Sequence, residues 1–155
     1  MNAQRRRVEQ VSARLTLGSV LWVFFGGAIG TLVRAALVFD ASETQELWLI
    51  GIINVLGACG LGLLLEAMSE PGVSATSRRR MRLGIGTGFF GGFTTYSSLS
   101  LLISLEVLDE RFLVASIYAL GTIILGALAT ILGMFLGARL SKRGSRDADP
   151  QAGGQ

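Results

Sequence analysis

The chain contains no histidine and a single cysteine, Cys59. The missing histidine excludes zinc sites and Ser-His-Asp or Cys-His catalysis, and a lone cysteine excludes an intrachain disulfide. Charged residues are also scarce, at 16% of 155 residues, against a hydrophobic share of 50%. This balance excludes a disordered acidic chain, a disulfide scaffold and an ordinary charged cytosolic enzyme. We therefore expect no enzymatic activity and no catalytic cofactor.

Charge is missing altogether from four long stretches, residues 15–33, 47–65, 83–105 and 112–138. About 20 apolar residues span a bilayer core, and these stretches are apolar all round rather than on one face. We predict an all-α membrane protein, a single membrane domain over 1–155. The four transmembrane helices are predicted at about 16–38, 47–67, 82–106 and 112–138. The tails, 1–14 and 141–155, are predicted to be flexible.

Basic residues gather on one side of this predicted arrangement. Twelve of the fourteen Lys and Arg residues lie in the two tails and in the connection between spans 2 and 3. They are Arg5, Arg6, Arg7, Arg14, Arg78, Arg79, Arg80, Arg82, Arg139, Lys142, Arg143 and Arg146. The other side has only Arg34 and Arg111 among six acidic residues. The positive-inside rule places both termini in the cytoplasm, and so strong a bias predicts one direction of insertion. Because the arginine runs flank membrane spans, we expect no nucleic-acid partner.

Several polar residues within or beside the spans allow two interpretations each. Asn54 in span 2 either makes a helix–helix hydrogen bond, worth about 0.6–2 kcal/mol, or faces water in a path across the membrane. Arg34, at the end of span 1, either snorkels to the outer interface or draws anions to a pore mouth. Tyr118 and Thr122 in span 4 are four residues apart and share a helix face, whose role stays open.

Span 3 predicts an interruption at the membrane midplane. Paired glycines at 91 and 92 are followed by five hydroxyl residues, Thr94, Thr95, Ser97, Ser98 and Ser100. Such a sequence makes a poor continuous helix, and irregular backbone at this depth must be buried in protein or line a cavity. Carbonyl groups freed by a break near 91–95 can surround a cation. The alternative is a close-packed helix that uses Gly84, Gly88 and Gly92, but we favour the functional break.

None of the four uncharged stretches contains Asp, Glu, Lys or His. A proton-coupled exporter normally needs an ionisable group inside the membrane, so a small multidrug antiporter of four-helix dual-topology design is disfavoured. A neutral lining of amides, hydroxyls and aromatic rings instead suits passive permeation of an anion, because N–H groups, O–H groups and ring edges are electropositive.

Three motifs in this order resemble the CrcB/Fluc family of fluoride channels: GGAIGTLVR at 26–34, NVLG at 54–57 and GFFGGFTTYSSLS at 88–100. The resemblance covers about residues 18–140. It implies four-helix subunits that pair as antiparallel dimers with two narrow pores, through which fluoride leaves the cytoplasm passively. It also implies a multi-pass protein of a bacterial-type plasma (inner) membrane, whose activity lowers the toxicity of fluoride in the cytoplasm.

The resemblance further implies roles for individual residues. A structural sodium ion at the dimer centre would be held by the backbone carbonyls of Gly91 and Thr94. The pore or fluoride path would include Asn54, Tyr96, Ser97, Ser98, Ser100, Tyr118, Thr122 and Arg34.

The chain also departs from the family pattern. Tyr96 and Leu99 stand where the family has two phenylalanines, whose ring edges contact fluoride, and leucine has no such edge. An antiparallel homodimer needs one sequence to insert in both directions, which the charge bias opposes. We therefore expect a heterodimer with an oppositely oriented, paralogous subunit. The alternative is a non-conducting accessory subunit of such a channel.

Overall fold

The computed structural model describes residues 16–69 and 73–147, whose regular elements are all helices, with no strand among them. The first helix among the described residues, α2, spans Leu17–Val38, and α3 spans Glu43–Ala67. Hydrogen bonds at their beginnings satisfy backbone groups that a helix leaves without a partner: Ser19 N–H donates to Thr16 Oγ1 at 3.4 Å, and Ser42 N–H to Gln45 Oε1 at 3.0 Å. α3 thus begins four residues before the predicted position.

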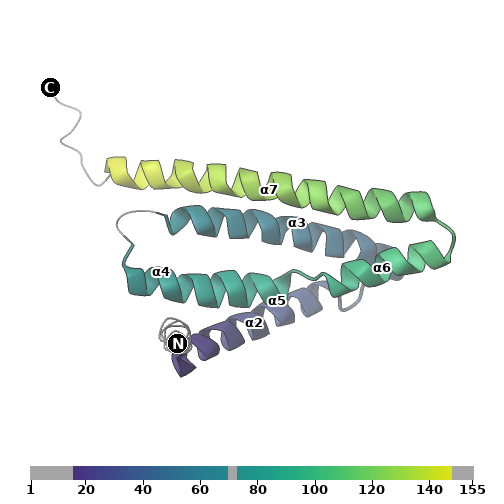
Figure 1. The fold of residues 1–155 in the computed structure, drawn as a ribbon, viewed down its shortest axis with the longest axis horizontal. Coiled ribbons are helices and arrows are strands. Elements are labelled where there is room, and N and C mark those ends of the chain that lie inside the picture. Colours follow the sequence, from purple (N-terminus) through teal and green to yellow (C-terminus); the bar gives the residue numbers. More distant parts are fainter. Residues whose placement is uncertain (1–15, 70–72, 148–155) are drawn as a thin grey trace, which may run out of the picture.

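The third crossing of the bundle is divided into segments. α4 (Ala75–Met81) leads into η1 (Arg82–Phe90), a π-helix, and then into α5 (Gly91–Phe93). After an interruption at residues 94–96, α6 (Ser97–Leu108) completes the crossing. The segments follow one another between the two ends of the bundle (Figure 1). The break lies within one residue of the predicted stretch, but the π-helix before it was not predicted.

The last helix, α7, spans Phe112–Asp147 and continues nine residues beyond its predicted end. The part of the predicted flexible tail from 141 to 147 is therefore helical, whereas residues 1–14 and 148–155 lie outside the described residues. Hydropathy marks only the end of the apolar stretch, so it does not predict that the helix continues into polar sequence.

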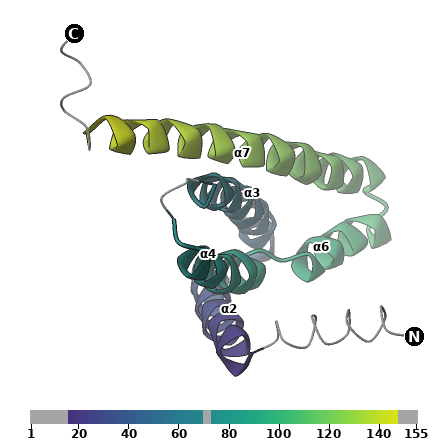
Figure 2. The same cartoon turned by 60° about the vertical axis from the view of Figure 1, so that its left-hand side comes forward.

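Two pairs of elements carry most of the packing, α3 against α7 and α2 against η1 and α5. Figures 1 and 2 show α7 along α3, with α2 on the far side of the third crossing. A Cβ atom added to Gly26 of α2 would collide with the carbonyl of Gly84, and one added to Gly133 of α7 with that of Cys59. Such close backbone approach drives helix association in lipid, where apolar burial contributes little.

The glycines of the third crossing agree with both interpretations of span 3, the close-packed glycine helix and the functional break. Gly84 faces Trp22, Gly88 faces the backbone of Val23 and Gly26, and Gly92 faces Gly27 and Thr31, all on α2. The glycine stripe is therefore a packing surface against α2, and the chain leaves the helix only after it. Gly91 and Gly92 are themselves helical.

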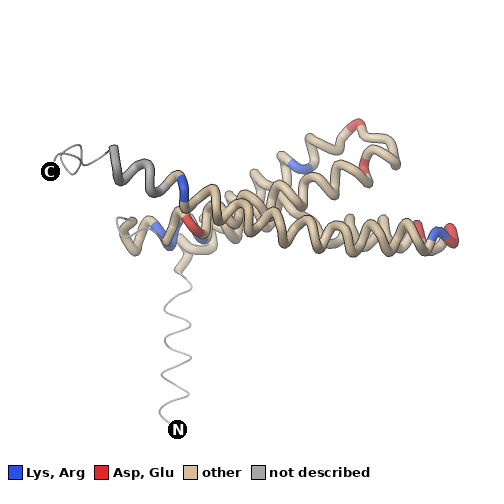
Figure 3. Tube along the Cα trace, turned by 90° about the horizontal axis from the view of Figure 1, so that it is seen from above, with Lys and Arg blue, Asp and Glu red and all other residues tan. Residues whose placement is uncertain are grey.

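The exterior of the bundle is apolar. Large side chains such as Phe24 and Phe135 are 64% and 65% exposed. Three helices, Leu17–Val38, Thr44–Ala67 and Phe112–Leu140, are long and apolar enough to cross a membrane. Most charged residues lie toward the two ends of the bundle (Figure 3), and Arg34, which is bonded beside the break, is the exception among the described residues. This distribution is that of a membrane protein, in which the divided third crossing lies between α3 and α2 (Figure 1).

Candidate functional site

The interruption of the third crossing begins at Thr94, whose φ of −77° and ψ of 158° are extended rather than helical. The backbone N–H and the Oγ1 of Thr94 both donate to the carbonyl of Phe90, at 3.0 and 2.8 Å, and so close the last helical turn. On the far side, the N–H of Ser98 donates to Thr95 Oγ1 at 3.2 Å. The hydroxyl of Thr95 thus satisfies an N–H group in the first turn of α6.

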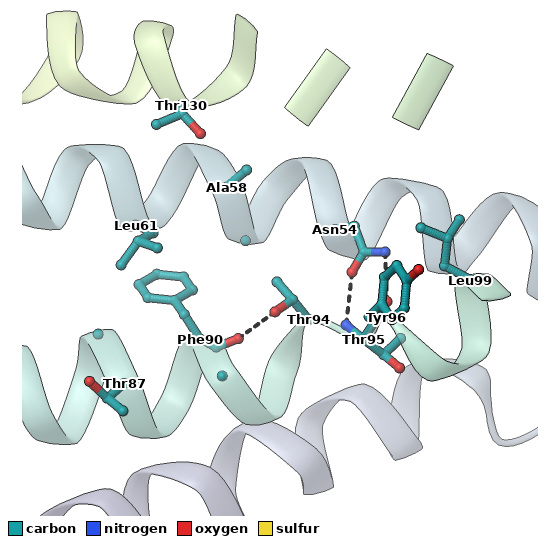
Figure 4. A pocket seen from close by; sticks show the side chains of 13 residues that line it. Asn54, Ala58, Leu61, Thr87, Phe90, Thr94, Thr95, Tyr96, Leu99 and Thr130 are labelled. Carbon is teal, nitrogen blue, oxygen red and sulfur yellow. Dashed lines mark hydrogen bonds between the residues drawn. The ribbon is translucent and has the colours of Figure 1, made fainter. Parts of the chain in front are cut away.

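Asn54 on α3 holds the interruption with both polar atoms of its side chain (Figure 4). Its Nδ2 donates to the carbonyl of Thr95 at 3.0 Å, and the N–H of Thr95 donates to its Oδ1 at 2.9 Å. Both backbone groups of one residue are thereby satisfied by one amide. In the described part of the chain Asn54 makes only these two hydrogen bonds, which leaves its second Nδ2–H as a donor. Asn54 therefore makes the predicted hydrogen bonds to another segment of the bundle and still has one N–H group that can donate.

Arg34 reaches the same turn from α2. Its Nε donates to the carbonyl of Gly92 at 3.2 Å, and Thr31 Oγ1 donates to that carbonyl at 3.5 Å. A cation is favourable at this position because the carbonyl groups at a helix C-terminus carry partial negative charge. The Arg34 guanidinium is thus bonded to the backbone just before the break, and its place in the fluoride path stays a prediction.

Two other carbonyl groups of this turn remain open. Among the described residues, those of Gly91 and Thr94 accept no hydrogen bond. In a continuous helix the N–H of Thr95 would bond to Gly91, but Asn54 holds it instead. A Cβ atom at Gly91 would meet nothing within 4 Å, so this carbonyl turn lies on an uncovered face of the protomer. These are the two residues for which cation contacts were predicted.

An open cavity of about 460 Å³ adjoins the break, between α3 and the third crossing. Asn54, Gly91, Thr94 and Tyr96 line it, and Thr130 of α7 closes one side (Figure 4). The structure thus brings together four of the ten predicted site residues. The described residues include no cluster of His, Cys, Asp or Glu that could hold a metal ion. Neutral oxygen atoms line this site, and open backbone carbonyl groups of this kind hold cations in broken membrane helices.

The two positions at which the family has phenylalanine differ in exposure. Tyr96 is 81% exposed and projects from the protomer, whereas Leu99 is 8% exposed and lines the cavity wall. Phe90 also lines the cavity, and its ring meets that of Phe89 edge-on at 5.3 Å. Phe90 was not among the predicted site residues. Its position shows that the cavity keeps a half-buried aromatic ring although Leu99 supplies none.

The serines predicted for the path lie beyond the cavity. Thr95 Oγ1 is 3.1 Å from Ser97 Oγ and 3.3 Å from Ser98 Oγ, so three hydroxyl groups form one cluster at the start of α6. Ser100 donates its N–H to Tyr96 at 2.9 Å. None of the three serines lines the described cavity.

Tyr118 and Thr122 line a different cavity, of about 520 Å³, between α3 and α7. The hydroxyl of Tyr118 donates to the carbonyl of Leu47 at 2.7 Å, and that of Thr122 donates to the carbonyl of Tyr118 at 2.8 Å. Within one protomer these hydroxyl groups are thus engaged with backbone, and the structure does not bring them to the cavity beside Asn54.

Two features of the site were missed by sequence reasoning. Thr95 is 9% exposed and links Asn54 to the serine cluster, and the Arg34 contact ties α2 to the same turn. A signal for the first was available, because Asn54 and Thr95 both lie within uncharged spans and an amide there needs a partner. No local pattern indicates that Arg34 meets Gly92.

Comparisons with known proteins agree on one family. The family model described as "CrcB-like protein, Camphor Resistance (CrcB)" matches residues 21–134. A protein of Leifsonia xyli called "Fluoride-specific ion channel FluC 2" is 42% identical over 132 residues, covering 81% of this chain and 87% of that protein. Cutibacterium acnes has two relatives, "FluC 1" with 38% identity, covering 68% of this chain and 76% of that protein, and "FluC 2" with 32% identity, covering 79% and 99%.

Proposed function

Because the chain belongs to the CrcB-like family, we propose that it is a subunit of a fluoride-specific ion channel that exports fluoride passively. The observation that carries this proposal is the break held open by Asn54, which places a free amide donor and two open carbonyl groups beside one cavity. Amide and hydroxyl donors suit an anion, and the described cavity has no carboxylate in its lining.

The driving force for export follows from the chemistry of fluoride. Acid outside a cell drives neutral HF inward, and the anion is trapped at cytoplasmic pH. A negative membrane potential then pushes the anion outward through an open path, with about 2.3 kcal/mol per charge per 100 mV. No further energy source is needed. The proposed location is a bacterial-type plasma membrane with both termini in the cytoplasm, since twelve of the fourteen basic residues lie on that side.

A structural sodium ion fits the open carbonyl groups of Gly91 and Thr94. Both belong to the C-terminal turn of α5, where carbonyl dipoles favour a cation, and Asn54 prevents Thr95 from occupying Gly91. Arg34 occupies the neighbouring carbonyl of Gly92 on the side that faces α2. The ion would therefore lie on the uncovered side of the turn, where a second subunit can supply further oxygen atoms.

The partner in our proposal is a paralogous subunit of opposite orientation. Tyr96 projects from the protomer with 81% of its surface exposed, and the turn at Gly91 is uncovered, so the cavity is incomplete within one chain. The charge bias opposes insertion of this sequence in both directions. That Cutibacterium acnes has both a FluC 1 and a FluC 2 supports pairing of two different subunits.

Fluoride efflux from liposomes, read with a fluoride electrode, tests the proposal. We expect little flux from this chain alone and rapid flux when it is co-purified with a related subunit of opposite charge bias. Flux from the single chain would keep the fluoride function and refute the heterodimer. Absence of flux from both preparations, with the proteins folded and inserted, would refute the function.

A second candidate, a non-conducting accessory subunit, is favoured by Leu99 alone. This side chain occupies the cavity wall where the resemblance leads us to expect an aromatic ring edge. If the chain is accessory, flux through the complex will survive Tyr96→Ala and Asn54→Ala in this subunit. If it forms a pore, both substitutions will lower the flux.

A further inference from the structure

A cavity of about 610 Å³ lies at the end of the bundle where α3 ends and α4 begins, well away from the break. We name it the basic cavity. It is lined by Leu65, Met68, Ser69, Val73, Ala75, Arg78, Arg79 and Arg82. Three of these eight residues are arginines, and none of the lining residues that the structure describes is acidic. Its chemistry is therefore cationic at one wall and apolar at the other.

The arginines are arranged to meet one ligand. Arg78 and Arg82 are four residues apart and share a face of the α4–η1 segment, and Arg79 lies beside them. Arg79 Nη2 donates to Ser19 Oγ at 2.7 Å, and Arg78 Nη2 to the carbonyl of Val73 at 3.4 Å, so both side chains are oriented by neighbouring elements. A guanidinium group has five N–H donors in a planar fork and binds phosphate oxygens in pairs, even while it holds another partner.

The opposite wall offers apolar surface toward the membrane. Leu65 is 42% exposed and lies in the last turn of a helix that crosses the membrane, with Val73 half-buried nearby. A small hydrated anion gains nothing from such a wall. An amphiphile with a phosphate group and an acyl chain matches both walls at once, because Arg82 directly precedes the uncharged stretch of span 3 and so marks the membrane surface.

We propose that the basic cavity binds the phosphate headgroup of an anionic phospholipid, with the acyl chain running along Leu65. Basic pockets between transmembrane helices on the cytoplasmic side bind such headgroups. The bound lipid would join α3 to α4, and so would brace the segment that leads into the π-helix and the break. This proposal requires that the chain lies in a membrane and is independent of the ion it conducts.

Native mass spectrometry of the full chain in detergent tests the proposal. The protein is offered equal amounts of phosphatidylglycerol and phosphatidylcholine with the same acyl chains, and retained lipid is counted. We expect the wild type to prefer phosphatidylglycerol at least about fivefold, the effect of one basic residue near an anionic headgroup. Equal retention of the two lipids would overturn the proposal.

Two variants locate the site. Arg78→Gln/Arg82→Gln removes two arginines from the basic cavity and is expected to lower the preference at least about fivefold, toward equal retention of the two lipids. Arg139→Gln is the matched control, since Arg139 is exposed near the same end of the bundle, on α7 and outside the cavity. An unchanged preference in the double variant, or an equal loss in the control, would place the lipid elsewhere and refute the cavity as its site.

Competition distinguishes a lipid from a soluble phosphate. Inorganic phosphate added to the wild type with bound phosphatidylglycerol is expected to displace little lipid, because it cannot use the apolar wall. Displacement at equal concentration would show that the arginines recognise free phosphate, and would overturn the lipid assignment. The wild-type measurements need no variant, so the proposal stays testable if the double variant fails to fold.

Discussion

Replacing Asn54 with leucine is expected to close the interruption of the third crossing. Leucine has a similar size but no polar atom, so the N–H and the carbonyl of Thr95 both lose their partner. The nearest helical acceptor for that N–H is the carbonyl of Gly91, four residues earlier. Asn54→Leu should therefore favour a continuous helix and occupy a carbonyl that we assign to sodium.

The expected loss of stability follows from the two hydrogen bonds, at 3.0 and 2.9 Å. Side-chain hydrogen bonds in membrane proteins are worth about 0.6 to 1.7 kcal/mol each, which gives a free energy of unfolding lower by about 1–3 kcal/mol. For a chain of this size each kcal/mol shifts Tm by about 2–4 °C, so the expected decrease is about 2–12 °C. Stabilisation by sodium, which follows RT ln(1 + [Na⁺]/Kd), should vanish as well.

The assay is thermal unfolding of the purified protein, with its dimer partner, in sodium and in N-methyl-D-glucamine buffers of equal ionic strength. The wild type should unfold at a higher temperature in sodium, and Asn54→Leu should not respond to the cation. Thr130→Val is the matched control, because its hydroxyl lines the same cavity but bonds only to Gly126 on its own helix. If Asn54→Leu keeps both the wild-type Tm and the sodium response, the amide does not hold the break open.

Three further substitutions test the site. Asn54→Asp should lower fluoride efflux from liposomes at least about a hundredfold, because a unit charge about 4 Å from the ion costs about 4 kcal/mol at an effective dielectric of 20; unchanged flux would mean that Asn54 only packs. Gly92→Ala should lower the free energy of unfolding by about 1–3 kcal/mol, since the new Cβ collides with the carbonyl of Gly27, whereas Gly126→Ala, with no neighbour within 4 Å, should be neutral or slightly stabilising in the same denaturation experiment. Leu99→Phe should raise the efflux rate of the heterodimer by restoring a ring edge beside the cavity, and a rate equal to or below that of the wild type would show that the second ring edge does not limit conduction.

The helical crossings were predictable because the bilayer imposes a simple requirement. A span needs about 20 residues without charge, and that property is local to the sequence. The position of the break was predictable for a similar reason, since hydroxyl residues after a glycine pair weaken a helix. The end of α7 was not predictable from hydropathy, because the helix continues to Asp147 into polar sequence where no apolar stretch marks its course.

The site could be predicted from the sequence only in part. Asn54, Gly91, Thr94 and Tyr96 meet at one cavity, whereas Tyr118 and Thr122 line another and Arg34 contacts the backbone of Gly92. The contact of Arg34 with Gly92 and that of Tyr118 with Leu47 each join residues 58 or more positions apart in the chain. Their geometry depends on how closely the helices approach, which no motif spacing expresses.

Sequence alone determined that this chain crosses a membrane, which side its basic residues favour, and where the third crossing weakens, since each depends on residues near one another in the chain. Only the tertiary structure decided which polar groups that weakness leaves open. Asn54 comes from another helix to take the N–H of Thr95, and Arg34 from a third to take the carbonyl of Gly92. The carbonyl of Gly91 stays open because its helical partner is held elsewhere, and long-range packing alone can arrange that.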